Sequence, residues 1–192
     1  MVLHTNKGKI LIELSDSTPL HRDNFIKLCN EGFYDSLLFH RCIKNFVIQA
    51  GDPESKHAAD TALLGNGDLG YTVPAEFKPS LFHKRGALGM ARDDNPEKAS
   101  SACQFYIVVG KDCTDSVFIK AEKRTGLKIP DDRKEFYRTS KGIPHLDMLY
   151  TVFGEVLKGM KVVDRIVKED TDANDRPLKP VRIRRTKVIE MY

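Results

Sequence analysis

Apolar and polar residues alternate in several short segments, and the first two lie at the start of the chain. Residues 2–5 and 9–14 are separated by Asn6-Lys7-Gly8, a sequence typical of a tight turn. In the second segment the apolar residues alternate with polar neighbours at Ile10, Ile12 and Leu14. Because successive side chains of a strand point to opposite faces, the pattern predicts a β-hairpin with one buried face.

Two segments have the spacing of amphipathic helices instead. Thr18 offers an N-cap oxygen, Pro19 suits the first helical position, and Gly32 ends the pattern. The apolar residues of this helix share one face: Phe25, Leu28 and Cys29. The second helix is expected at residues 160–168, where a similar face is formed by Val162, Val163, Ile166 and Val167.

Residues 38–43 and 46–50 form the most informative pair of segments. They read as two short strands joined by Lys44-Asn45, and they place a cation, Arg41, among apolar residues. Period-two alternation predicts that Phe39 and Arg41 share a face, beside Phe46 and Gln49. His40 is expected on the opposite face, as a structural residue bonded to a backbone group.

Most of the remaining chain consists of short strand patterns and turns rich in Gly and Pro, with no internal repeat. This pattern predicts a mainly β fold, a barrel with two helices. The length of 192 residues suits a single domain over residues 1–192.

Charge and cysteine content narrow the function classes. The net charge of +4 is too small to indicate nucleic-acid binding, and Arg182, Arg184 and Arg185 alternate with apolar residues as on the solvent face of a strand. Four cysteines occur without CxxC spacing, so we expect free buried thiols and no metal or cofactor. No stretch reaches the roughly 18 apolar residues of a membrane helix.

These features predict a cytoplasmic protein. Free thiols suit a reducing compartment, and no signal peptide opens the chain. A periplasmic or exported location would follow if a leader had been removed before Met1.

The segment Gly65-Asn66-Gly67-Asp68-Leu69-Gly70 matches the G-x-G-x-x-G pattern of phosphate-binding loops. That chemistry requires a following helix whose N-terminal amides face the phosphates. Here Tyr71-Thr72-Val73-Pro74 follows, which is strand-like and broken by proline. The pattern therefore favours a surface turn, forming part of a groove wall, over a nucleotide site.

Arg41 is the strongest candidate for chemistry. Its guanidinium stays charged at neutral pH, so it serves as a hydrogen-bond donor and not as a proton shuttle. Rotation about an X-Pro peptide bond needs such a donor, aimed at the prolyl nitrogen, together with an apolar slot for the ring. No serine or cysteine is grouped with a histidine in a way that supports a hydrolytic triad.

Four blocks of sequence resemble the cyclophilin-type peptidyl-prolyl isomerases. They occur in the family's order: the F-H-R…F..Q.G-D run from Phe39 to Asp52, Gly89-Met90-Ala91-Arg92, Gln104-Phe105-Tyr106-Ile107-Val108, and Val152-Phe153-Gly154-Glu155-Val156. The resemblance implies a closed eight-stranded barrel capped by two helices. It also implies isomerisation of X-Pro bonds in protein substrates, assisting protein folding.

The resemblance assigns roles position by position. It makes Arg41 the catalytic residue, with amide contacts from Gln49 and Gln104 and main-chain contacts near Ala91 and Arg92. The remaining substrate-binding positions are the apolar ones and a nearby tyrosine: Phe46, Val47, Tyr106, Leu146 and Tyr150. The partners implied are proline-containing peptides and unfolded or flexible proteins, bound by a monomer.

The chain also departs from the family pattern. Val47 replaces a common methionine, Tyr106 a phenylalanine and Tyr150 a histidine. His145 stands where a tryptophan is associated with tight cyclosporin binding, so we expect weak cyclosporin binding.

The largest departure is an insertion at about residues 111–142. Residues 115–125 and 131–139 have helical patterns, so we expect a helical excursion beside the groove that tunes access without taking part in the chemistry. The insertion resembles those of bacterial, particularly Bacteroides-like, members of the family.

Two functions remain open from the sequence. The first is an active isomerase, and the second is a proline-peptide binding module with little or no turnover. The presence of Arg41 favours the isomerase, because binding a proline ring requires only the apolar slot, whereas catalysis requires preference for the twisted bond.

Overall fold

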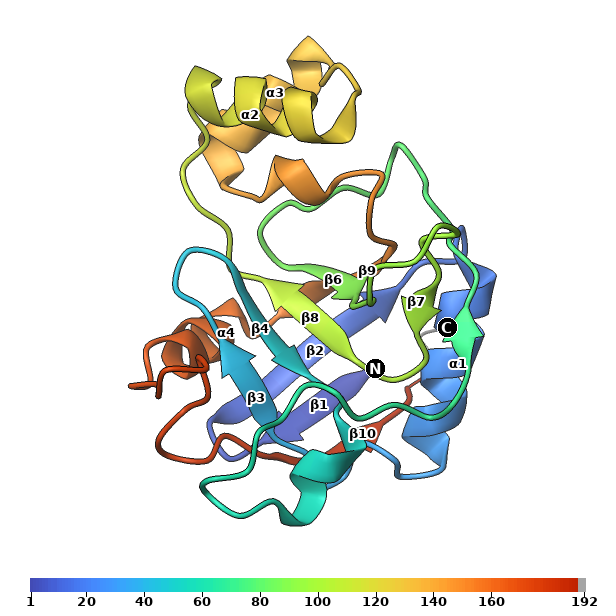
Figure 1. The fold of residues 1–192 in the computed structure, drawn as a ribbon, viewed down its shortest axis with the longest axis vertical. Coiled ribbons are helices and arrows are strands. Elements are labelled where there is room, and N and C mark those ends of the chain that lie inside the picture. Colours follow the sequence, from blue (N-terminus) through green and yellow to red (C-terminus); the bar gives the residue numbers. More distant parts are fainter. Residues whose placement is uncertain (190–192) are drawn as a thin grey trace.

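The computed structural model describes residues 1–189. Eight strands form one sheet in the order β10-β1-β2-β9-β6-β8-β4-β3, as Figure 1 shows in ribbon form. Their bounds are β1 Val2–Thr5, β2 Gly8–Leu14, β3 Phe39–Cys42, β4 Val47–Ala50, β6 Ala87–Met90, β8 Phe105–Val108, β9 Val152–Lys158 and β10 Ile183–Lys187. A separate pair joins β5 Thr72–Val73 to β7 Ser100–Ser101. The expected mainly β fold is confirmed.

The sheet curls into a nearly closed barrel. Its edge strands β3 and β10 do not form a full ladder. Instead a bridge between Leu38 and Arg182 joins the edges, together with hydrogen bonds from Phe39 N to Val181 O of 2.8 Å and from Ser36 N to Ile183 O of 2.7 Å. These bonds join the two edges of the sheet at a few points, so the barrel is nearly but not fully closed.

The barrel interior holds a single apolar core. Strand residues alternate between this core and the outer face, so Ile48 and Ala50 point inward from β4, and Phe105 and Ile107 point inward from β8. Four aromatic rings meet in the core: Phe25, Tyr34, Phe105 and Phe153. Burial of this surface supplies the main driving force for the fold.

Two helices pack against the barrel, as expected: α1, Pro19–Asn30, and α4, Met160–Val167. Thr18 is the N-cap residue and Pro19 the first helical residue, as expected, but the Thr18 side chain makes no capping bond and donates to Ser15 O instead. The carboxylate of Glu76 accepts from the N–H groups of Leu20 and His21, at 3.2 and 3.0 Å. A carboxylate from a distant loop thus satisfies the free amides at this helix start.

The insertion forms the helices α2, Asp115–Thr125, and α3, Asp131–Ser140, at the top of Figure 1. It has a small apolar cluster of its own, formed by Cys113, Phe118, Ala121, Ile129 and Tyr137. The insertion leaves and returns through a bridge between Lys111 and Gly142. Helix α2 packs against the short 3₁₀ helix η2, Pro144–Leu146, which borders the candidate site.

Candidate active site

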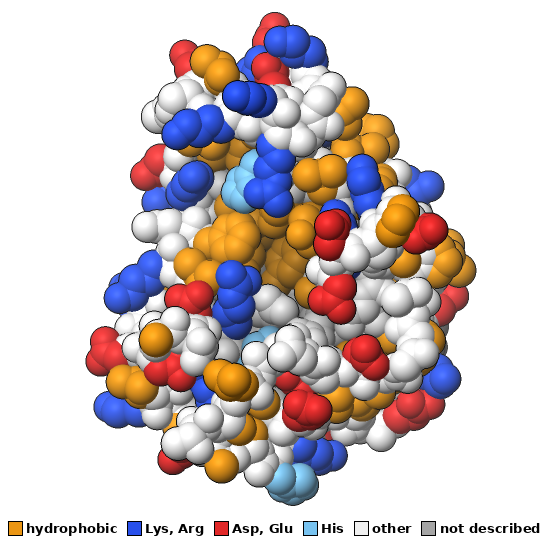
Figure 2. Space-filling view, viewed as in Figure 1, with side chains coloured by type: hydrophobic (Ala, Val, Ile, Leu, Met, Phe, Trp, Pro, Cys, Tyr) orange, Lys and Arg blue, Asp and Glu red, His pale blue; other side chains and the backbone are white. Residues whose placement is uncertain are grey.

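A groove of about 430 Å³ crosses the outer face of the barrel over β3, β4 and β8. Figure 2 shows an apolar hollow at the centre of this face, with basic side chains above and below it and acidic ones on its right side. The groove brings together nine of the ten expected site residues: Arg41, Phe46, Val47, Gln49, Ala91, Arg92, Tyr106, Leu146 and Tyr150.

The apolar part of the groove is a second cluster, outside the barrel core. Val47 on β4 and Tyr106 on β8 point outward because their neighbours Ile48 and Ile107 point inward. Leu146 from η2 completes the slot, and all three are nearly buried. Phe46 and Tyr150 are partly buried against the same cluster. The slot therefore offers an apolar surface shaped by side chains from several separate segments.

Gly89 is required beneath this slot. It faces Tyr106 across the β6–β8 ladder, and a Cβ at this position would lie 2.3 Å from a carbon of the Tyr106 ring. Only glycine lets the ring lie flat over the strand, since real Cβ atoms do not approach carbon so closely.

Arg41 lies at the margin of the slot, on β3 opposite Gln49 of β4. Its Nε is 3.8 Å from Asp175 Oδ2, and the side chain is 42% exposed, so this ion pair is loose and solvated. The guanidinium makes no hydrogen bond to any residue in the range 1–189, which leaves its donors available to a ligand.

The expectation that Phe39 and Arg41 share a face is wrong. The β3–β4 register shifts between these two residues, as in a β-bulge. Phe39 packs in the barrel core, whereas Arg41 faces the groove. The bulge re-aims the following residue, which simple alternation does not anticipate.

The expectation for His40 is wrong for the same reason. The ring lines the groove instead of pointing away from Arg41, and neither ring nitrogen has a hydrogen-bond partner in the described part of the chain. Burial lowers the pKa of His40 to about 4, so the imidazole is neutral at pH 7.

The two expected glutamines have different places. Gln49 lines the groove and donates through Nε2 to Gln104 Oε1 at 3.0 Å. Gln104 lies behind it, 6% exposed, and its own Nε2 donates to Gly65 O and Gly67 O at 2.9 and 2.8 Å. All the polar atoms of the Gln104 amide are thus engaged, so this side chain holds Gln49 and a loop and does not reach the groove.

That loop is the glycine-rich segment at 65–70. Gly65 and Asn66 line the groove, as expected for part of its wall, and the short strand β5 follows where a phosphate loop would need a helix. The carboxylate of Asp52 accepts from the N–H groups of Glu54 and Gly65 and anchors the loop.

Ala91 and Arg92 form the opposite wall. The backbone of Ala91 is already engaged, because its N–H donates to Gln104 O and its C=O accepts from Ser101 N, both at 2.8 Å. The Arg92 guanidinium lies 4.7 Å above the Tyr150 ring and donates through Nε to Leu149 O at 3.0 Å. The side chain of Arg92 is therefore fixed as part of the wall.

A buried hydrogen-bond network, which no pattern in the sequence predicts, lies beneath the slot. The Tyr106 hydroxyl lies 2.9 Å from His83 Nε2, and His83 Nδ1 lies 2.8 Å from Asp147 Oδ1. The second oxygen of Asp147 accepts from the Tyr137 hydroxyl at 2.8 Å. When Nδ1 donates to the carboxylate, Nε2 is placed to accept from the Tyr106 hydroxyl. The network joins the insertion, through Tyr137, to the slot.

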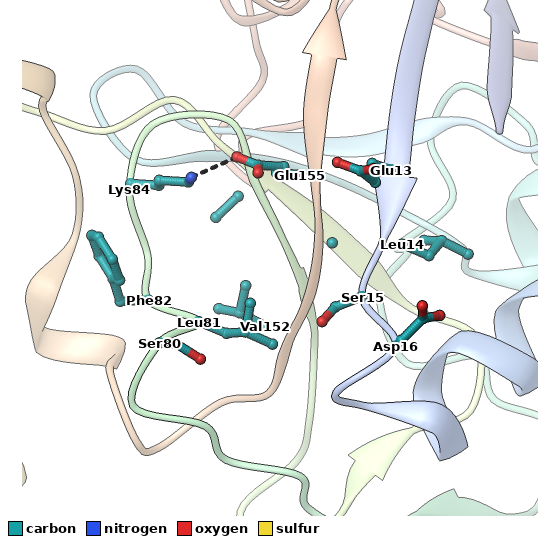
Figure 3. Close-up of a pocket in the computed structure, with 12 residues that line it drawn as sticks. Glu13, Leu14, Ser15, Asp16, Ser80, Leu81, Phe82, Lys84, Val152 and Glu155 are labelled. Atoms are coloured by element: carbon teal, nitrogen blue, oxygen red, sulfur yellow. Dashed lines mark ion pairs between the residues drawn. The ribbon is translucent and has the colours of Figure 1, made fainter. Parts of the chain in front are cut away.

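A second hollow, of about 300 Å³, lies between the end of β2, the 80–84 loop and β9, and Figure 3 shows it in close-up. Its lining carries three carboxylates, those of Glu13, Asp16 and Glu155. Its one cation, Lys84, is 2.6 Å from Glu155 Oε2. Because Lys84 is paired with Glu155, this second hollow has, within residues 1–189, no unpaired cationic side chain to act as a hydrogen-bond donor, unlike the groove at Arg41.

No group of metal-ligating side chains is found within residues 1–189. The four cysteines are free and buried, and burial raises the pKa of Cys29 and Cys42 to about 12. None of the helices described has both the length and the apolar character needed to cross a bilayer.

The structure is thus a nearly closed β-barrel that carries an apolar groove, flanked by an arginine, on its outer face. Residues 1–188 match the family model described as cyclophilin type peptidyl-prolyl cis-trans isomerase/CLD. The chain belongs to this family, and its activity is that of a peptidyl-prolyl cis-trans isomerase.

Relatives match over most of their length. The chain is 33% identical to a peptidyl-prolyl cis-trans isomerase of Arabidopsis thaliana over 98% of this chain and 94% of that protein. It is 31% identical to a putative peptidyl-prolyl cis-trans isomerase of Staphylococcus haemolyticus, covering 95% of this chain and 87% of the relative.

A solved cyclophilin of Cryptosporidium parvum has the same fold. The TM-score is 0.73 at 24% identity, covering all of this chain and 97% of that one. A second structure of that protein, determined in the presence of the dipeptide Ala-Pro, gives a TM-score of 0.69 at 23% identity, covering 99% and 98%.

Proposed function

We propose that the protein accelerates rotation about X-Pro bonds at this groove, with Arg41 as the catalytic residue. The observation that carries the proposal is a guanidinium without a hydrogen-bond partner in residues 1–189, at the margin of an apolar slot. Uncatalysed rotation takes on the order of 10–100 s at 25 °C. A 10⁵-fold acceleration requires the protein to stabilise the twisted X-Pro bond by roughly 7 kcal/mol more than the planar bond.

Arg41 supplies part of this preference electrostatically. Twisting the bond ends amide resonance and localises a lone pair on the prolyl nitrogen. A charged N–H donor stabilises that lone pair more than the planar amide, and the effect grows where the slot excludes water. The remainder comes from holding the substrate in the twisted geometry.

The other residues bind and position the chain. Phe46, Val47, Tyr106 and Leu146 hold the proline ring, with Tyr150 at the edge of the slot. Gln49 contacts the substrate backbone, and Gln104 acts as a positioning residue by holding Gln49. The main-chain groups of Arg92, next to Ala91, hold the substrate backbone.

The substrates we propose are exposed proline segments of unfolded or flexible proteins, whose isomerisation assists protein folding. The groove is open along the surface, which suits an extended chain, and a related protein has been crystallised in the presence of Ala-Pro.

One chain supplies every residue of the groove, so a monomer with one domain is sufficient. Four free buried cysteines suit the reducing cytoplasm. Bacterial relatives agree with a bacterial source, and a Bacteroides-like origin of the insertion stays a prediction.

The second candidate is a binding module without turnover. NMR exchange spectroscopy on a short X-Pro peptide separates the two, because exchange cross-peaks between cis and trans signals report turnover directly. We expect exchange to accelerate at catalytic concentrations of protein. Peptide binding, seen as shifted groove resonances, without faster exchange would contradict the isomerase and support the module.

A further inference from the structure

The insertion contributes a side chain to the groove. Arg124 lies in the last turn of α2 and lines the same hollow as Phe46, His145 and Leu146. Its position follows from the packing of α2 on η2, the element that carries His145. Arg124 thus belongs to the groove although its segment lies outside the barrel.

The groove lining carries positive charge only. It contains Arg41, Arg92 and Arg124 and no Asp or Glu. Arg41 and Arg92 have carboxylate neighbours at 3.8 and 3.6 Å, in Asp175 and Asp94. Arg124 is exposed and has no ion pair or hydrogen bond with any residue from 1 to 189.

The acidic residues of α2, the helix that carries Arg124, are paired with other cations. Asp115 lies 2.6 Å from Arg138, and Glu122 lies 2.9 Å from Lys134. These are the only two acidic residues of α2. The helix therefore presents Arg124 to the groove without a compensating carboxylate.

His145 does not add a charge at this end. Its ring stacks on Phe46, with centroids 5.9 Å apart, and burial lowers its pKa to about 4, with Arg124 and Lys111 adding to the shift. The ring is neutral at pH 7, so the charge at this end comes from Arg124 and the nearby Lys111.

We propose that Arg124 forms an anion subsite at the His145 end of the groove, so that the protein prefers proline segments carrying a Glu or Asp within a few residues of the proline. This inference rests on the proposed function, because it names the substrate class of the same groove. The guanidinium matches the planar carboxylate in shape as well as in charge.

The test is a peptide series with one proline and a single Glu at each of three positions before and after it. A matched series carries Gln, which has the same shape without the charge. Turnover is measured by NMR exchange at low and high salt for wild type, Arg124→Ala and Arg124→Glu. Lys123→Ala is the matched control, since it removes one exposed charge of α2 that does not line the groove.

For at least one position, we expect wild type to turn over the Glu peptide about threefold to fivefold faster than the Gln peptide, in kcat/KM, as for a partly solvated ion pair. The preference should shrink at high salt, vanish in Arg124→Ala, reverse in Arg124→Glu and persist in Lys123→Ala. Equal rates for all Glu and Gln peptides in wild type, or a preference that survives Arg124→Ala, would overturn the subsite.

Failure of the isomerase function would show differently. The neutral Gln peptides would then bind without faster exchange in every protein tested. The subsite would in that case be judged on the Kd values of the same peptide pairs, where an Arg124-dependent preference for Glu supports it and equal values overturn it.

Discussion

His145 determines the character of one end of the groove. It stacks on Phe46 with an interplanar angle of 12°, and its pKa of about 4 keeps it neutral. An imidazole offers less apolar area than an indole, so a large apolar macrocycle finds a smaller surface here. The rest of the slot is intact, which explains why we expect peptide turnover but only weak cyclosporin binding.

We therefore predict that His145→Trp tightens cyclosporin binding by about tenfold or more, since an added ring contributes roughly 1–2 kcal/mol of packing and an N–H donor. Isothermal titration of wild type and variant measures the two Kd values. Nanomolar binding by the wild type, or no change in the variant, would show that this position does not set the affinity.

The place of a side chain was predictable from the sequence where neighbouring residues determine it. It was not predictable where a residue far away in the sequence determines it. Arg41 stood out in the sequence because a cation among apolar strand residues is unusual, whereas the residues of the slot were assigned from the family resemblance; all of them line the groove. Glu76 caps α1, and the side-chain amide of Gln104 is held by the loop at Gly65. Each of these hydrogen bonds joins residues more than 35 positions apart in sequence, so no local pattern predicts it.

The insertion is the largest addition to the barrel, and it consists of the helices α2 and α3. Its two ends meet in the Lys111–Gly142 bridge, with backbone hydrogen bonds of 3.1 and 3.2 Å, so the barrel could close without it. Its helices were predicted from sequence because helix-forming residues act locally, although neither helix has a capping hydrogen bond from a side chain. The Tyr137–Asp147–His83–Tyr106 network was not, since it joins residues from four separate segments.

We predict that replacing residues 114–141 with a short Gly/Ser linker keeps kcat/KM on a neutral tetrapeptide within about tenfold, roughly 1.4 kcal/mol. The free energy of unfolding should fall by about 1–3 kcal/mol, because buried Asp147 loses the Tyr137 hydroxyl. Urea unfolding and the peptide assay measure the two effects.

Tyr137→Phe is the matched control for this deletion. It removes the same hydroxyl while it keeps both helices, so it should account for most of the stability loss. Loss of tetrapeptide turnover in a linker variant that still unfolds cooperatively would show that the insertion helps to build the catalytic site.

The whole molecule carries several buried imidazoles that favour the neutral form. Burial lowers the pKa of His21, and it lowers those of His40 and His145 to about 4, from an ordinary value of 6.5. Between these values the unfolded chain binds protons that the folded protein does not. Stability therefore falls as the pH drops from 6.5 toward 4.

We predict a lower free energy of unfolding at pH 4.5 than at pH 6.5, with a smaller drop in His145→Gln, measured by urea unfolding at constant ionic strength. Carboxylates with a lowered pKa, such as Glu122 at about 2, lose their contribution mainly below this window. Unchanged stability across the window would mean that these imidazoles are not buried in neutral form.

The fold as a whole was the most predictable level. The order of four sequence blocks fixes which strands surround the groove, and the barrel needs only the alternation of apolar residues to form its core. The β-bulge at His40 was not predictable, because one extra residue in a ladder leaves the composition of the strand unchanged.

The central claim is that Arg41 stabilises the twisted bond, and exchange NMR on one X-Pro peptide with wild type, Arg41→Ala and Arg41→Lys tests it most directly. Loss of one charged donor costs roughly 3–4 kcal/mol at a transition state. We predict that Arg41→Ala lowers kcat/KM at least about a hundredfold while its unfolding curve stays near that of wild type, and that Arg41→Lys restores only part of the rate, because an ammonium lacks the planar fork. Exchange in Arg41→Ala near the wild-type rate would contradict the account.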